Sequence, residues 1–152
     1  MVVGSVLFIL SLTNLLLVAG NTLALRWRPE AIYRRQGEVQ ALDWLAQRAE
    51  PDDVALSAYE TGNYLPVRVH ARVFVGHGPE TVDYGEKRRL MHRFFDPATD
   101  HAWRQRLLRE YSVDYVFWGP AERREGAFDP QTASYLHPIY ESEPYVIFEV
   151  CP

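Results

Sequence analysis

The sequence predicts an α/β protein. We expect an N-terminal transmembrane helix, followed by a small three-layer α/β domain with a mostly parallel sheet and an antiparallel C-terminal hairpin. Three observations support this fold class. Residues 1–25 contain no charged side chain, although the chain has 16 Lys and Arg and 20 Asp and Glu residues. Beyond them, short apolar runs alternate with helix-type patterns, which is typical of parallel sheets. The C-terminus then holds two strand-type runs around Glu143-Pro144.

The N-terminal segment Val2–Leu25 is uncharged and longer than the roughly 20 residues that a helix needs to cross a bilayer. The alternative is a cleaved signal peptide, which needs a basic region that only the start amine could supply here. Arginines at 26, 28, 34 and 35 suit lipid headgroups. We therefore expect a transmembrane helix over 1–25, a basic interfacial linker over 26–35 and a soluble α/β domain over 36–152.

The orientation of this helix is open on the residues alone. With Met1 as the start, the arginines favour a cytoplasmic domain. If the helix is the last of a longer polytopic protein, earlier helices can override that preference.

The composition excludes several function classes. The net charge is −4, and no basic stripe marks a nucleic-acid binder. Cys151 is the single cysteine, so neither an internal disulfide nor a cysteine-based zinc site is expected. The five histidines form no HxH, HxxxH or HExxH spacing, and no serine lies in a GxSxG context. We expect no metal, no cofactor and no serine nucleophile.

The elements of the domain follow in order from its apolar patterns. An apolar stripe from Val39 to Ala49 predicts a helix that Pro51 ends. Strands are expected at Val54–Ser57 and Arg72–Val75, with a turn and a short helix in the segment ETGNYLPVRV between them.

The helices and strands of the second half of the domain are predicted from the same kind of pattern. Asp83 opens a helix that runs to about Phe95, where Asp-Pro breaks it, and a further helix covers 101–111 with Trp103 and Tyr111 inward. A strand follows at Tyr115–Trp118. The remaining segments are a loop through GPAERREGAFDP, a helical turn around 132–136 and a C-terminal hairpin.

Polar residues follow each of the first three strands. In an open parallel sheet, ligands bind outside the carboxyl ends of the strands, so these clusters would lie along one edge. The candidate ligand-binding residues are Glu60, Thr61, Asn63, His77, Glu80, Thr81, Glu122 and Arg123.

The segment GHGPET, from Gly76 to Thr81, is the most distinctive of these clusters. It lacks the lysine of a phosphate loop and is not GxGxxG. His77 could serve as an acid, a base or a ligand, or it could bond Glu80 or Glu60 in an ordinary turn. Glu60 and Glu80 could equally be solvated loop carboxylates. We expect both glycines of the segment to serve backbone geometry.

The stretches ETGNYLP, GHGPET and YVFWGP-AER carry a resemblance that extends over essentially the whole chain. The chain resembles the C-terminal end of certain bacterial polytopic membrane proteins. Those proteins are similar to GT-C glycosyltransferases of the protein-mannosyltransferase and lipid A aminoarabinose-transferase type. The resemblance implies polyprenyl-phosphate sugar donors and a small extracytoplasmic α/β domain after the last helix. In such enzymes the catalytic acidic residues lie in an early loop that this chain lacks, so no catalytic residue is carried over.

The expected function is therefore that of a non-catalytic C-terminal module, which covers the active site or recognises the acceptor. We expect the chain to be single-pass in the cell membrane, with its soluble domain extracytoplasmic and no catalysis by the domain alone. Its expected partners are the lipid bilayer, the remaining transmembrane part of a glycosyltransferase, and a polyprenyl-phosphate sugar or an acceptor glycan. One alternative is a stand-alone, membrane-anchored binding module for a small polar or anionic ligand. Another is a hydrolase that uses His77 with Glu60 or Glu80.

Overall fold

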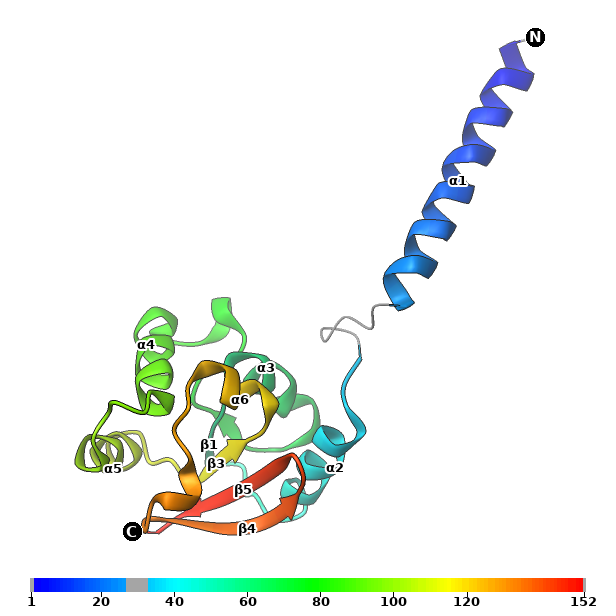
Figure 1. Ribbon diagram of the computed structural model, residues 1–152. Helices are drawn as coiled ribbons and strands as arrows, with labels where there is room; N and C mark the ends of the chain where they lie inside the picture. Colours follow the sequence, from blue (N-terminus) through cyan, green and yellow to red (C-terminus); the bar gives the residue numbers. More distant parts are fainter. Residues whose placement is uncertain (1, 27–32, 152) are drawn as a thin grey trace. The chain divides into compact units, whose positions relative to one another are not determined.

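The computed structural model describes residues 2–26 and 33–151 (Figure 1). The chain divides into two units, Met1–Arg35 and Gln36–Pro152, which are described separately. Helix α1 spans Val2–Arg26 in the first unit. Within the described residues no helix combines the length and the hydropathy needed to cross a membrane, so the prediction of a transmembrane helix is not supported. Most of the predicted basic linker lies outside the described residues.

The second unit is a five-stranded sheet with helices packed on it, here called the α/β domain. Its strands are β1 (Val54–Leu56), β2 (Arg72–Val73), β3 (Tyr115–Trp118), β4 (Leu136–Ser142) and β5 (Tyr145–Val150). Its helices are α2 (Gln36–Leu45), α3 (Tyr59–Arg68), α4 (Tyr84–Phe95), α5 (His101–Glu110) and α6 (Pro120–Glu125), with 3₁₀ turns η1 (Gly78–Glu80) and η2 (Pro130–Thr132).

The strand order is β2-β1-β3-β5-β4. Strand β1 pairs in parallel with both neighbours, so that Ala55 lies beside Val73 on one side and Tyr115 on the other. Strand β5 is antiparallel to β3 and to β4, which confirms the predicted C-terminal hairpin. The sheet is therefore mixed rather than mostly parallel, because the hairpin contributes antiparallel pairings equal in number to the parallel ones.

Alternate residues of the strands pack on opposite faces of the sheet, which gives the three predicted layers. Leu56 and Val116 belong to the core cluster that includes the apolar sides of α4 and α5. Ala55 and Phe117 belong to a second cluster with α2 and with Leu65 of α3. Figure 1 shows α4 and α5 apart from α2, with the sheet between them.

Two short helices, α3 and α6, form in segments where the sequence predicted less helical structure. Helix α3 has ten residues and covers nearly all of the segment that was expected to form a turn with a short helix, with Pro66 inside it. Helix α6 replaces the first half of an expected loop, and its first residues are capped by Glu122, whose side chain accepts from the Gly119 N–H. Helix α2 begins at Gln36 and ends at Leu45, earlier than its apolar stripe indicated.

Arg104 is a buried charge at the corner between α4 and α5. Its side chain is 1% exposed. The guanidinium donates to the carbonyl oxygens of Phe94 at 2.8 Å, Thr99 at 2.6 Å and Asp96 at 2.5 Å. It also lies 3.6 Å from the centre of the Phe128 ring. Arg104 thus fixes the end of α4, the loop after it and the start of α5 relative to one another.

Two glycines let α3 approach the end of β2 closely. A Cβ on Gly62 would lie 2.0 Å from the Val75 carbonyl oxygen, and one on Gly76 would lie 2.8 Å from the Gly62 carbonyl oxygen. Gly76 therefore serves backbone geometry as expected. Gly78 does not have a positive φ, and a Cβ there would make an ordinary contact 3.5 Å from Tyr84.

We expect Gly62→Ala to destabilise the α/β domain by about 1–3 kcal/mol or more, because the added methyl group overpacks against backbone that cannot rotate away. Urea denaturation of the purified chain measures the change. Gly85→Ala is the matched control, since a Cβ there meets nothing within 4 Å and Ala is the better helix former. Equal stability of both variants would show that α3 and β2 can separate without cost.

Candidate functional site

The carboxyl ends of β1, β2 and β3 lie at one edge of the sheet, because β1 is parallel to both of the others. Helix α3 follows β1 at this edge, η1 follows β2, and α6 follows β3. The three polar clusters predicted from the sequence therefore follow strands that end on the same side.

Glu122 is a fully buried acidic residue of this edge, with an exposed fraction of 0%. One carboxyl oxygen accepts from the Ala58 N–H at 2.9 Å, and the other accepts from the Gly119 N–H at 2.8 Å. The buried Thr61 side chain also hydrogen-bonds to it. Burial raises the pKa of the Glu122 carboxyl, and the hydrogen bonds from Thr61 and from the backbone oppose that effect. Glu122 and Thr61 thus tie the end of β1 to the end of β3.

Glu60 and Asn63 lie on α3 and are half-buried. The Glu60 carboxylate lies 4.0 Å from Arg124, the second arginine of α6. The Asn63 side-chain oxygen is buried and has no hydrogen-bond partner within the described part of the chain. Arg123 is exposed, and its guanidinium lies 3.9 Å from the centre of the Trp118 ring. These side chains from α3, α6 and β3 carry the polar surface of the edge.

The GHGPET segment forms a turn. Thr81 closes it, because its hydroxyl donates to the His77 carbonyl oxygen at 3.0 Å and lies 3.4 Å from the Gly76 N–H, which donates to it. The His77 Nδ1 atom lies 3.8 Å from the Glu80 Oε1 atom, and the two side chains are 64% and 81% exposed. His77 therefore pairs with Glu80 of the same segment. This is the arrangement of an ordinary turn.

We expect His77→Ala to change the free energy of unfolding by less than about 1 kcal/mol, because the imidazole is exposed and makes one solvated pairing. Urea denaturation of the two proteins side by side measures it. A loss above about 2 kcal/mol would mean that His77 supports the fold of the turn.

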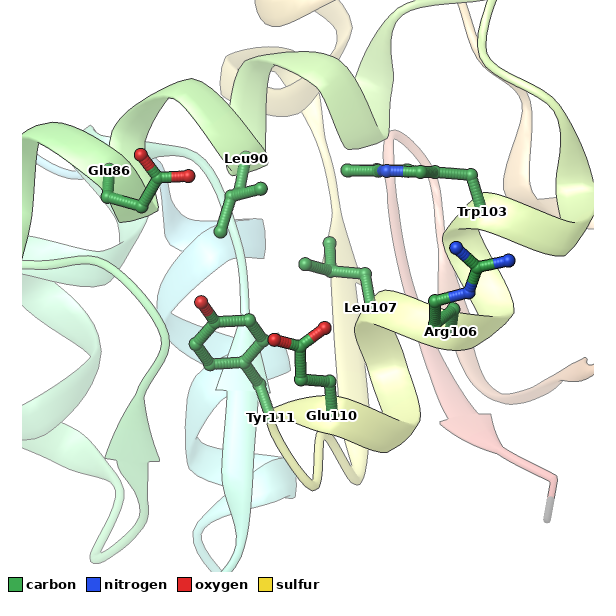
Figure 2. A pocket seen from close by; sticks show the side chains of 7 residues that line it. All are labelled: Glu86, Leu90, Trp103, Arg106, Leu107, Glu110 and Tyr111. Carbon is green, nitrogen blue, oxygen red and sulfur yellow. The ribbon is translucent and has the colours of Figure 1, made fainter.

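A hollow between α4 and α5, here called the α4–α5 cleft, was not expected from the sequence (Figure 2). Its volume is about 120 Å³. It is lined by Glu86, Leu90, Trp103, Arg106, Leu107, Glu110 and Tyr111. Trp103 and Tyr111 were expected to be core residues, but both are only half-buried. The available signal was the spacing of Trp103, Leu107 and Tyr111, which places these three side chains on one face of a helix.

Comparison with known proteins gives a likeness in structure and not in sequence. No family model matches the chain, and no curated protein matches it. The C-terminal globular domain of an oligosaccharyltransferase from Archaeoglobus fulgidus superimposes with a TM-score of 0.57 at 14% identity. The match covers 78% of this chain and 99% of that one.

At this identity the likeness establishes the fold. The α/β fold of this chain is that of a domain found at the C-terminus of a glycan-transferring enzyme, and nearly the whole of that domain takes part in the match. The resemblance carried by ETGNYLP, GHGPET and YVFWGP-AER implied a small α/β domain, and the structural likeness agrees with it in fold.

Proposed function

We propose that residues 36–152 form the non-catalytic C-terminal module of a GT-C-like membrane glycosyltransferase. The observation that carries the proposal is the structural likeness to the complete C-terminal globular domain of an oligosaccharyltransferase. The resemblance carried by ETGNYLP, GHGPET and YVFWGP-AER also supports it, because it implies a small α/β domain at the C-terminal end of such a transferase.

A non-catalytic role accords with the chemistry of the strand-end edge. The carboxyl of Glu122 is fully buried and already engaged by two backbone N–H groups, so it is not available to a substrate. His77 is highly exposed and pairs with a nearby exposed carboxylate. Catalytic acids and bases usually need a desolvated environment that tunes their pKa. The edge is better suited to contacting a partner or a glycan.

The module would act at the outer face of the membrane, where it covers the active site or recognises the acceptor glycan. The sugar donor in this proposal is a polyprenyl-phosphate sugar. The ligand-contacting residues proposed at the edge are Glu60, Asn63, His77, Glu80 and Arg123, while Thr61, Thr81 and Glu122 hold the edge in shape.

Deleting the codons for residues 36–152 in cells that produce the chain tests this proposal. Membranes from these cells should transfer less labelled sugar from polyprenyl-phosphate mannose or aminoarabinose than membranes with the intact gene. The purified full chain alone should transfer none. Unchanged transfer after the deletion would contradict the module function and favour a stand-alone binding module.

The proposed side of the membrane can be tested with the natural cysteine. Cys151 is free and exposed in the described part of the chain. A maleimide that cannot cross membranes should label it in intact cells that produce the full chain, and Cys151→Ser should abolish the signal. Labelling that appears only after lysis would place the α/β domain in the cytoplasm.

A further inference from the structure

We propose that the α4–α5 cleft binds one neutral sugar unit of a glycan. The inference rests on the proposed function and deepens it, since it assigns acceptor recognition to a place that lies between two helices and not among the predicted site residues. The cleft joins apolar walls with a few polar groups, which is the usual make-up of a small-molecule site.

The apolar part of the cleft comes from both helices. Leu107 is 3% exposed, and Leu90, Trp103 and Tyr111 are half-buried beside it. Figure 2 shows these four side chains around one gap, with Leu90 coming from α4 and Trp103 and Leu107 from α5. A pyranose ring presents apolar C–H groups on its faces, and these pack well on flat aromatic and branched aliphatic side chains.

Both aromatic walls are held in place before any ligand arrives. The Arg93 guanidinium lies 4.2 Å from the centre of the Trp103 ring. Tyr111 packs edge-on against Phe74 with ring centres 5.0 Å apart. A wall that is already ordered loses little conformational entropy on binding, so a weakly bound ligand such as a single sugar can still be retained.

The polar groups of the cleft match hydroxyl groups. The Glu86 and Glu110 carboxylates can accept hydrogen bonds from a sugar, and the Arg106 guanidinium can donate to it. Figure 2 shows all three on the rim of the gap. A sugar hydroxyl both donates and accepts, so it can use either kind of group.

Charges of both signs surround the cleft, which favours a neutral ligand over either kind of ion. Glu86 is already paired with Arg89, and Glu110 and Arg106 carry opposite charges. A phosphate would meet the Glu110 carboxylate, and an ammonium group would meet the Arg106 guanidinium. Like charges across a binding site oppose the wrong ligand.

The size of the cleft limits the ligand to one ring. Its volume is about 120 Å³. Pockets for drug-sized ligands begin at about 300 Å³. A single sugar unit at the end or the branch of a glycan is therefore the appropriate match.

Titration of the isotopically labelled full chain with methyl α-mannopyranoside and with methyl N-acetylglucosaminide tests the inference. The Trp103 indole N–H signal, assigned by its absence in Trp103→Phe, should shift and saturate with at least one of them. Trp103→Ala should weaken binding by about tenfold, as expected for the loss of one stacked ring. Glu110→Gln should weaken binding without unfolding the chain, because Glu110 is exposed.

Two controls lie on other elements. Trp44→Ala changes an α2 residue that packs on Tyr140, and Glu141→Gln changes an exposed carboxylate of β4, so neither should alter binding. No saturating shift with either sugar overturns the inference. Tighter binding of mannose 1-phosphate or of agmatine than of the neutral glycosides also overturns it. This readout needs no transferase, so the two proposals can fail separately. Sugar binding together with unchanged transfer after the deletion would reject the proposed function alone. Lost transfer without sugar binding would reject only the proposal that the cleft binds a sugar.

Discussion

Glu122→Ala is expected to destabilise the α/β domain by about 3–5 kcal/mol. The substitution leaves the N–H groups of Ala58 and Gly119 and the Thr61 hydroxyl buried without their acceptor. Each buried donor left unpaired costs roughly 1–3 kcal/mol, and the vacated volume adds to the loss. Urea denaturation of the variant and the parent protein measures the difference.

Glu122→Gln is the matched control for shape. The amide keeps one acceptor oxygen, but its NH₂ group faces a backbone donor that the second carboxyl oxygen served. We expect an intermediate loss of about 1–3 kcal/mol. If Glu122→Ala changed stability by less than about 1 kcal/mol, the ends of β1 and β3 would not depend on this carboxyl group.

The same residue should make stability depend on pH. Burial raises the pKa of Glu122 in the folded chain above its ordinary value of 4.5, so the folded state holds its proton where the unfolded state has lost it. The contribution of Glu122 to stability is therefore complete below about pH 4.5 and declines as the pH rises through the folded pKa. The stability of the parent protein relative to Glu122→Gln should fall over that range. A difference that grows with pH would mean that hydrogen bonding outweighs burial.

Arg104→Ala is expected to cost about 3–5 kcal/mol. Its guanidinium satisfies the carbonyl oxygens of Phe94, Asp96 and Thr99 and packs on Phe128, so truncation removes several buried contacts together. Burial also lowers the pKa of Arg104, which is the cost that these contacts offset. Thermal unfolding followed by circular dichroism measures the loss.

Arg104→Lys should recover little of that stability, since one ammonium group cannot reproduce the fork that meets three carbonyl groups. Arg109→Ala is the control on the same helix, because Arg109 is exposed and should change stability by less than about 0.5 kcal/mol. Comparable losses for Arg104→Ala and Arg109→Ala would show that the corner between α4 and α5 is held by apolar packing alone.

Much of the fold followed from local sequence. The strand Tyr115–Trp118 and the hairpin around Glu143-Pro144 have the predicted bounds to within about a residue, because apolar runs end sharply at turn residues there. Helix α3 was underestimated because Gly62 and Pro66 indicate a turn. Close packing of Gly62 on the Val75 carbonyl group, which no local pattern reveals, stabilises it as a helix.

The candidate site was predictable in position but not in detail. The shared edge follows from the order of strands and helices, as expected for a parallel arrangement. Glu122 points inward because backbone N–H groups there need an acceptor after folding. The Arg104 side chain is buried because carbonyl groups at the end of another helix need a donor. Charged residues on amphipathic helices normally face solvent, so the sequence gives no reason to bury these two.

The dependence of sugar transfer on acceptor concentration tests the central claim most directly. Membranes with the intact chain, with residues 36–152 deleted and with Trp103→Ala should be compared at a saturating concentration of polyprenyl-phosphate sugar. If the α/β domain is an acceptor-recognising module, the deletion and Trp103→Ala should both raise the KM for the acceptor, and Trp103→Ala should leave kcat unchanged. Identical transfer rates in all three membranes at every acceptor concentration would contradict the account.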